Sequence, residues 1–80
     1  MIHVKFFAGL RERMGFAEQE VDAAMADTVA DVWVLVTGGS ALPEDVLAAV
    51  NLEYAHAATA VCDDDEVAFF PPVTGGGKWA

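Results

Sequence analysis

The residues best suited to chemistry lie at the end of the chain, in the segment FFPPVTGGGKWA. Pro71 and Pro72 restrict the backbone to an extended, polyproline-like form, and Val73 and Thr74 are slim residues that prefer extended geometry. Glycines follow, which let a backbone approach another surface closely, and six stretched residues reach about 20 Å. The sequence therefore predicts a domain over residues 1–70 and an extended tail over 71–80 that enters a channel too narrow for side chains. A glycine-rich linker into a tag or another domain is the alternative.

Length and charge restrict the kinds of protein that carry this tail. The chain has 80 residues, 55% of them apolar, which is enough for one small domain with a modest core. Its net charge of -9 repels phosphate backbones, so nucleic acid is not an expected partner. The acidity either favours encounter with a basic protein or only keeps an apolar domain in solution.

Cysteine usage and hydropathy indicate where the protein works. Cys62 is the single cysteine, so no intrachain disulfide can form, and a lone thiol without an export signal indicates a reducing cytoplasm. No apolar stretch approaches the roughly 18 residues that a bilayer span needs, and we expect no membrane association.

The first half of the chain predicts two strands and two helices. Apolar residues alternate from residue 2 to 6, the pattern of a strand with one buried face, and residues 8–14 can form a short helix that Gly15 ends. Residues 18–24 are a weaker strand, with Val21 and Ala23 facing inward. Thr28 is a good N-cap, Asp31 completes a variant of the capping box, and the apolar stripe that follows predicts a helix that ends at the glycines 38–39.

The second half predicts the remaining strands. Residues 46–55 are expected to form one strand with Asn51 partway along, and residues 66–70 form the last, with Val67 and Phe69 on one face. Four or five strands and one main helix predict an α+β fold of two layers. With the first and last strands adjacent in the middle of a mixed sheet, this is the ubiquitin-like β-grasp, although periodicity does not establish the strand order.

Three stretches of this chain resemble a known family. MIHVKFFAGLRERMG at the start, AAVN at 48–51 and DDDEVAFFPPVTGG at 63–76 are similar to the small subunit of molybdopterin synthase. The likeness runs from residue 1 to 76, by pattern more than by letter in the middle, and DEVAFFPPVTGG is its most specific part.

The resemblance implies a β-grasp sulfur carrier in molybdenum cofactor synthesis. In this family an E1-like adenylating enzyme uses ATP to activate the terminal glycine, here Gly76, and sulfur then replaces AMP to leave a thiocarboxylate. The charged tail, with Gly75 as the slender neighbour, inserts into a large subunit, a heterotetramer in all, and donates sulfur to cyclic pyranopterin monophosphate. Two charged carriers serve each dithiolene. The carrier itself is expected to hold no cofactor and to supply no general base.

The resemblance also suggests a partner interface. Phe70, and with it Phe7, is expected to pack on the large subunit beside the tail exit, with core burial as the alternative for both. Phe69 is expected in the core because it shares a face with Val67.

Other polar residues are interpreted as structural. The run Asp63 to Glu66 lacks the ligand spacing of a calcium loop and is expected to be a solvated turn, strained at Asp64, where the family commonly has glycine. His3 and His56 have no second ligand at metal spacing, so no metal site is predicted. Cys62 is expected to be a small packing residue.

The chain departs from the family after Gly76, because four further residues, GKWA, follow it. As written, Gly76 has no free carboxylate. A protease removes residues 77–80, or they belong to an engineered addition or a natural fusion, or the protein never carries sulfur. Three functions therefore stay open: the molybdopterin synthase carrier, another carrier of the ThiS type or a protein modifier, and a non-catalytic interaction module with a blocked tail.

Overall fold

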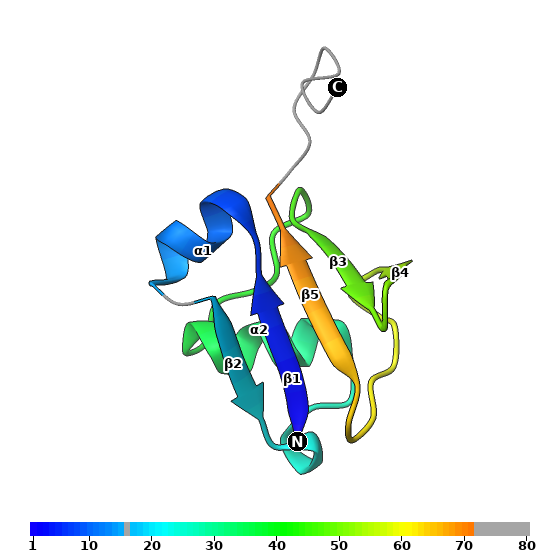
Figure 1. Ribbon diagram of the computed structural model, residues 1–80. Helices are drawn as coiled ribbons and strands as arrows, with labels where there is room; N and C mark the ends of the chain where they lie inside the picture. Colours follow the sequence, from blue (N-terminus) through cyan, green and yellow to red (C-terminus); the bar gives the residue numbers. More distant parts are fainter. Residues whose placement is uncertain (16, 72–80) are drawn as a thin grey trace.

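The computed structural model describes residues 1–15 and 17–71, which form one mixed sheet and its helices (Figure 1). The elements in chain order are β1 (Ile2–Phe6), α1 (Ala8–Met14), β2 (Glu18–Val21), the 3₁₀ turn η1 (Ala23–Met25), α2 (Val29–Thr37), β3 (Leu47–Val50), β4 (Glu53–Ala55) and β5 (Glu66–Phe70). The sheet has five strands in the order β2-β1-β5-β3-β4.

The first and last strands lie side by side in the centre of the sheet. β1 pairs with β5 in parallel, whereas the β1–β2, β3–β5 and β3–β4 pairs are antiparallel. Ile2, Val4 and Phe6 all point to one face and are buried, as their alternation predicts. The prediction of an α+β, ubiquitin-like β-grasp with a mixed sheet is therefore confirmed.

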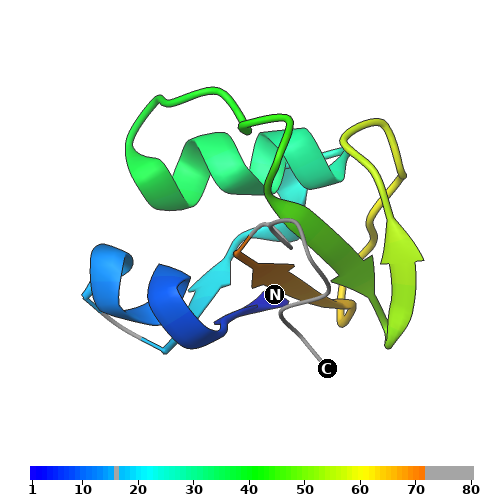
Figure 2. The same cartoon turned by 90° about the horizontal axis from the view of Figure 1, so that it is seen from above.

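Helix α2 crosses one face of this sheet (Figure 2). The Thr28 hydroxyl accepts a bond from the Asp31 N–H, the Asp31 carboxylate accepts one from the Thr28 N–H, and Gly38 ends the helix at φ 76°, so the predicted capping box and stop are both confirmed. Val32 is fully buried, and Trp33 packs edge-on against Phe69 with ring centroids 4.9 Å apart. The opposite face of the sheet, toward the viewer in Figure 1, is not covered by α2; we call it the open face.

Two sequence-based expectations about strands are wrong in detail. Residues 46–55 form a hairpin of two strands, because Asn51 and Leu52 both adopt positive φ and turn the chain back. β2 ends at Val21, and Ala23 instead begins the short turn η1, which the Asp22 carboxylate caps through the Ala24 N–H.

Cys62 was expected to be a small packing residue, and this is also wrong because its side chain is exposed. The neighbouring Val61 takes the buried position, and its N–H bonds the Asp27 carbonyl. The Cys62 N–H donates to the Asp65 carboxylate at 2.8 Å, which places this residue in the outer turn before β5. No helix among the described residues is both long and apolar enough to cross a bilayer.

Candidate tail exit and partner-binding face

The predicted tail begins where the central strand β5 ends. Pro71 directly follows Phe70 and is half-buried, and because β5 is the central strand the chain leaves the domain from the middle of the sheet. Proline cannot donate a backbone hydrogen bond, which is consistent with the end of the ladder at this point. The remaining predicted tail residues lie outside the described part of the chain: Pro72, Val73, Thr74, Gly75 and Gly76.

Two phenylalanines stack beside this exit. The rings of Phe7 and Phe70 are nearly parallel, with centroids 5.1 Å apart and an interplanar angle of 9°. The parallel register of β1 and β5 aligns Phe6 with Phe69, so the next residue of each strand emerges at the same end of the sheet. Phe7 is 42% exposed, whereas Phe69 is fully buried. The sequence assigned Phe69 to the core and Phe70 to the other side, and the structure confirms both positions.

The stack forms one end of a shallow groove of about 230 Å³ on the open face. Its floor contains Ala49 and Ala68, which face each other across the β3–β5 ladder, and Glu66 is the charged residue among those that line it. Small side chains at the floor leave room between the larger side chains at the rim. The remaining lining residues are Phe7, Leu52, Tyr54 and Phe70.

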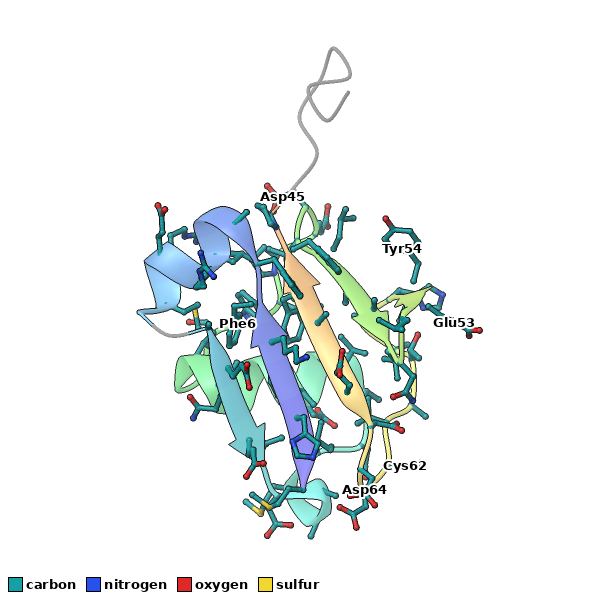
Figure 3. The ribbon with its side chains drawn as sticks, viewed as in Figure 1. Phe6, Asp45, Glu53, Tyr54, Cys62 and Asp64 are labelled. Atoms are coloured by element: carbon teal, nitrogen blue, oxygen red, sulfur yellow. The ribbon has the colours of Figure 1, made fainter. Side chains whose placement is uncertain are left out.

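The far rim of the groove was not predicted from the sequence. Leu52 is 90% and Tyr54 is 84% exposed, and Figure 3 shows Tyr54 beside β4. The available signal in the sequence was Asn51, followed by apolar residues at positions 52 and 54. It was missed because residues 46–55 were read as one strand, which hid the turn at Asn51 and Leu52.

The side of the open face over β1 and β2 carries polar and charged side chains. His3 on β1 is 3.1 Å from the Glu20 carboxylate on β2, and the Lys5 ammonium is 3.5 Å from Glu66 on β5. These side chains are largely solvated, and such pairs contribute about 0–1 kcal/mol each. The open face is thus largely apolar over β5, β3 and β4 and polar over β1 and β2.

The acidic run before β5 is a solvated turn, as predicted. Asp63 and Asp64 are exposed, and Asp64 adopts φ 72°, the strained conformation that the sequence predicted for this turn. The terminal ammonium of Met1 bonds the Asp63 carboxylate and lowers the pKa of that carboxyl. Within residues 1–15 and 17–71, no group of three histidine, cysteine or carboxylate side chains could hold a metal ion.

Hydrogen bonds of Asn51 join this turn to the β3–β4 hairpin. The Asn51 side-chain amide donates to the Asp65 carboxylate at 3.0 Å, and its oxygen accepts the Glu66 N–H at 3.0 Å. The Asn51 N–H also donates to the Glu66 carbonyl at 2.8 Å. These bonds hold the hairpin against the start of β5.

Comparisons with known proteins agree with this arrangement. The family model described as "ThiS family" matches residues 4–76. The molybdopterin synthase sulfur carrier subunits of Escherichia coli and Haemophilus influenzae are 41% and 39% identical to this chain, each over 95% of it and 100% of the relative.

Solved structures include SAMP1 of Haloferax volcanii, with a TM-score of 0.77 and 30% identity over 94% of this chain and 98% of that one. A second structure of this H. volcanii protein, described as small archaeal modifier protein 1, has a TM-score of 0.75 and 28% identity over 90% of this chain and 97% of that one. The family match extends through the second glycine of the predicted tail, and the likeness to the two carrier subunits spans nearly the full chain. This chain belongs to the ThiS family and, within it, to the sulfur carrier subunits of molybdopterin synthase.

Proposed function

We propose that this protein donates sulfur, held as a thiocarboxylate on Gly76, to cyclic pyranopterin monophosphate during molybdenum cofactor synthesis. The observation that carries the proposal is the family match, which runs to residue 76 and so includes the Gly75-Gly76 pair. The described fold supports it, because β5 directs the chain out of the centre of a rigid sheet at Pro71.

The chemistry assigns one role to Gly76 and leaves catalysis to partner proteins. A carboxylate is a poor electrophile because its charge is delocalised. An E1-like enzyme activates it with ATP, forming an acyl adenylate and releasing pyrophosphate. Sulfur at the oxidation level of sulfide then attacks the acyl carbon and AMP leaves, which gives the thiocarboxylate without a redox step. The ionised sulfur is a soft nucleophile, as thiolates are.

This step needs a free carboxylate at Gly76, whereas residues 77–80 follow it in the sequence. Hydrolysis of the Gly76–Gly77 amide supplies that carboxylate and releases GKWA. We propose that this cleavage precedes adenylation. Lys78 and Trp79 would also obstruct a channel sized for glycine.

The partner that receives the charged tail is, in this proposal, the large subunit of molybdopterin synthase in a heterotetramer. The tail lead-in of Pro71, Pro72, Val73 and Thr74 enters that subunit. The Phe7–Phe70 stack packs against it beside the exit, because this stack is the apolar part of the open face adjacent to Pro71. The reactions use cytoplasmic ATP, and we assign the protein to the cytoplasm.

Intact mass spectrometry tests the proposal. A chain that ends at Gly76 is incubated with ATP, the organism's adenylating enzyme and a sulfur donor. We expect a mass increase equal to the exchange of one oxygen for sulfur, and no change for the chain of residues 1–80. A chain ending at Gly76 that accepts neither AMP nor sulfur would refute the proposal. In the native cell, retention of GKWA during cofactor synthesis would instead support a non-catalytic interaction module.

A second candidate function is attachment to lysine side chains of other proteins. The likeness to small archaeal modifier protein 1 favours it, since that protein shares the fold and 28% of the aligned residues. The same acyl adenylate would transfer Gly76 to an amine and form an isopeptide bond. Digested cell proteins that carry a glycine remnant on lysine would support this function. Their absence would count against lysine attachment and leave sulfur donation as the proposed function.

A further inference from the structure

The β3–β4 turn carries a residue that its backbone does not favour. Asn51 and Leu52 adopt φ values of 51° and 72°, the conformation of a two-residue turn in which glycine usually occupies the second position. Asparagine tolerates this region, but a leucine side chain is disfavoured there.

Nothing within the described fold requires a leucine at this position. The side chain is 90% exposed and therefore packs against little of its own domain. The bonds that hold the turn against β5 come from Asn51, which contacts Asp65 and Glu66. Leu52 thus combines an unfavourable backbone conformation with an apolar side chain in water, and strain of this kind concentrates at functional positions.

Leu52 is also continuous with the apolar surface beside the tail exit. It lines the groove whose opposite end is the Phe7–Phe70 stack, with Tyr54 beside it on the same rim. A protein that receives the tail must approach the end of β5, and it would then cover this groove as far as the hairpin.

We propose that Leu52 is an anchor that inserts into an apolar pocket of the protein that receives the tail. This inference rests on the proposed function, which makes that protein the large subunit of molybdopterin synthase. The Glu66 carboxylate lines the groove, and the whole chain has a net charge of -9, so a receiving pocket with basic side chains at its rim would complement this surface.

The decisive variant is Leu52→Gly, because it affects stability and binding in opposite directions. An Asn-Gly pair suits this turn, so the melting temperature should rise or stay unchanged. Affinity for the purified large subunit of the same organism, measured by calorimetry with residues 1–80 and with the chain ending at Gly76, should fall about tenfold or more, as for anchors at other interfaces. Leu52→Asn, which also tolerates positive φ, should behave in the same way.

Two control variants separate this inference from the proposed function. Met25 is another exposed apolar residue, 64% accessible, and lies on η1 at the opposite end of the molecule from the tail exit. Met25→Ser should leave affinity unchanged. Phe70→Ala removes half of the stack beside the exit and should weaken binding.

The expected outcomes differ for the Leu52 anchor and for the proposed interface beside the tail exit. Wild-type affinity in both Leu52 variants, with weakened binding in Phe70→Ala, would overturn the anchor and retain the interface. Wild-type affinity in all of these variants would reject the interface itself. Weaker binding together with a large loss of melting temperature in both Leu52 variants would assign Leu52 a structural role and also overturn the anchor.

Discussion

The substitution Asn51→Ala tests how the fold holds the hairpin beside the tail-bearing strand. It removes two side-chain bonds, from the Asn51 amide to Asp65 and from the Glu66 N–H to the Asn51 oxygen, each 3.0 Å long. It also places alanine at φ 51°. The backbone bond from the residue 51 N–H to the Glu66 carbonyl is retained, so the loss is confined to these two effects.

The expected magnitude follows from these terms. Each hydrogen bond contributes about 0.5–1.5 kcal/mol, and these two lie at the lower end because the groups are solvated. Positive φ costs an alanine about 1–2 kcal/mol. The free energy of unfolding should therefore fall by about 2–3 kcal/mol. For a domain of this size that corresponds to a melting temperature lower by about 10–20 °C.

Asn51→Gly is the matched comparison, because glycine adopts positive φ without strain but lacks both side-chain bonds. Chemical denaturation of the three proteins should rank them as wild type, Asn51→Gly and Asn51→Ala in decreasing stability. If Asn51→Ala stays within about 0.5 kcal/mol of the wild type, the range of an ordinary surface change, the hairpin is not held in this way. Equal stability of the two variants would show that backbone strain contributes nothing.

Three further predictions concern the helix, the acid limb of stability and the core. Gly38→Ala should lower the free energy of unfolding by about 1 kcal/mol in urea titrations, because Gly38 ends α2 at φ 76°; an unchanged midpoint would contradict this. The pKa of Asp31 lies below its usual 3.8, chiefly because its carboxylate accepts the Asp27 N–H. The ionised Asp31 therefore stabilises the folded protein above pH 3.8, and this contribution is lost as the pH falls toward the lowered pKa. Asp31→Asn should flatten the decline of the urea midpoint in that window, and an identical decline would argue against it. Phe69→Ala should cost about 3–5 kcal/mol because the ring is fully buried, whereas Phe7→Ala, at 42% exposure, should cost about 1 kcal/mol; similar melting temperatures for the two variants would be inconsistent with the structure.

Much of the fold could be predicted because its signals are local. The alternation from Ile2 to Phe6, the Thr28–Asp31 capping box and the stop at Gly38 each depend on residues within one or two turns of chain, and all three are present. The hairpin was missed because its turn lacks the usual local signal. Leu52 occupies a turn position where glycine is the usual signal, so the apolar run from 46 to 55 resembled one strand.

The sequence alone determined that this is a small acidic α+β domain followed by a proline- and glycine-rich segment, because composition and short-range patterns suffice for that. The face proposed to bind the partner required the tertiary structure. Phe7 meets Phe70 only because β1 and β5 pair in parallel, and Leu52 joins them only because β3 lies beside β5. Such pairings bring distant parts of the chain together, and no local preference encodes which strands become neighbours.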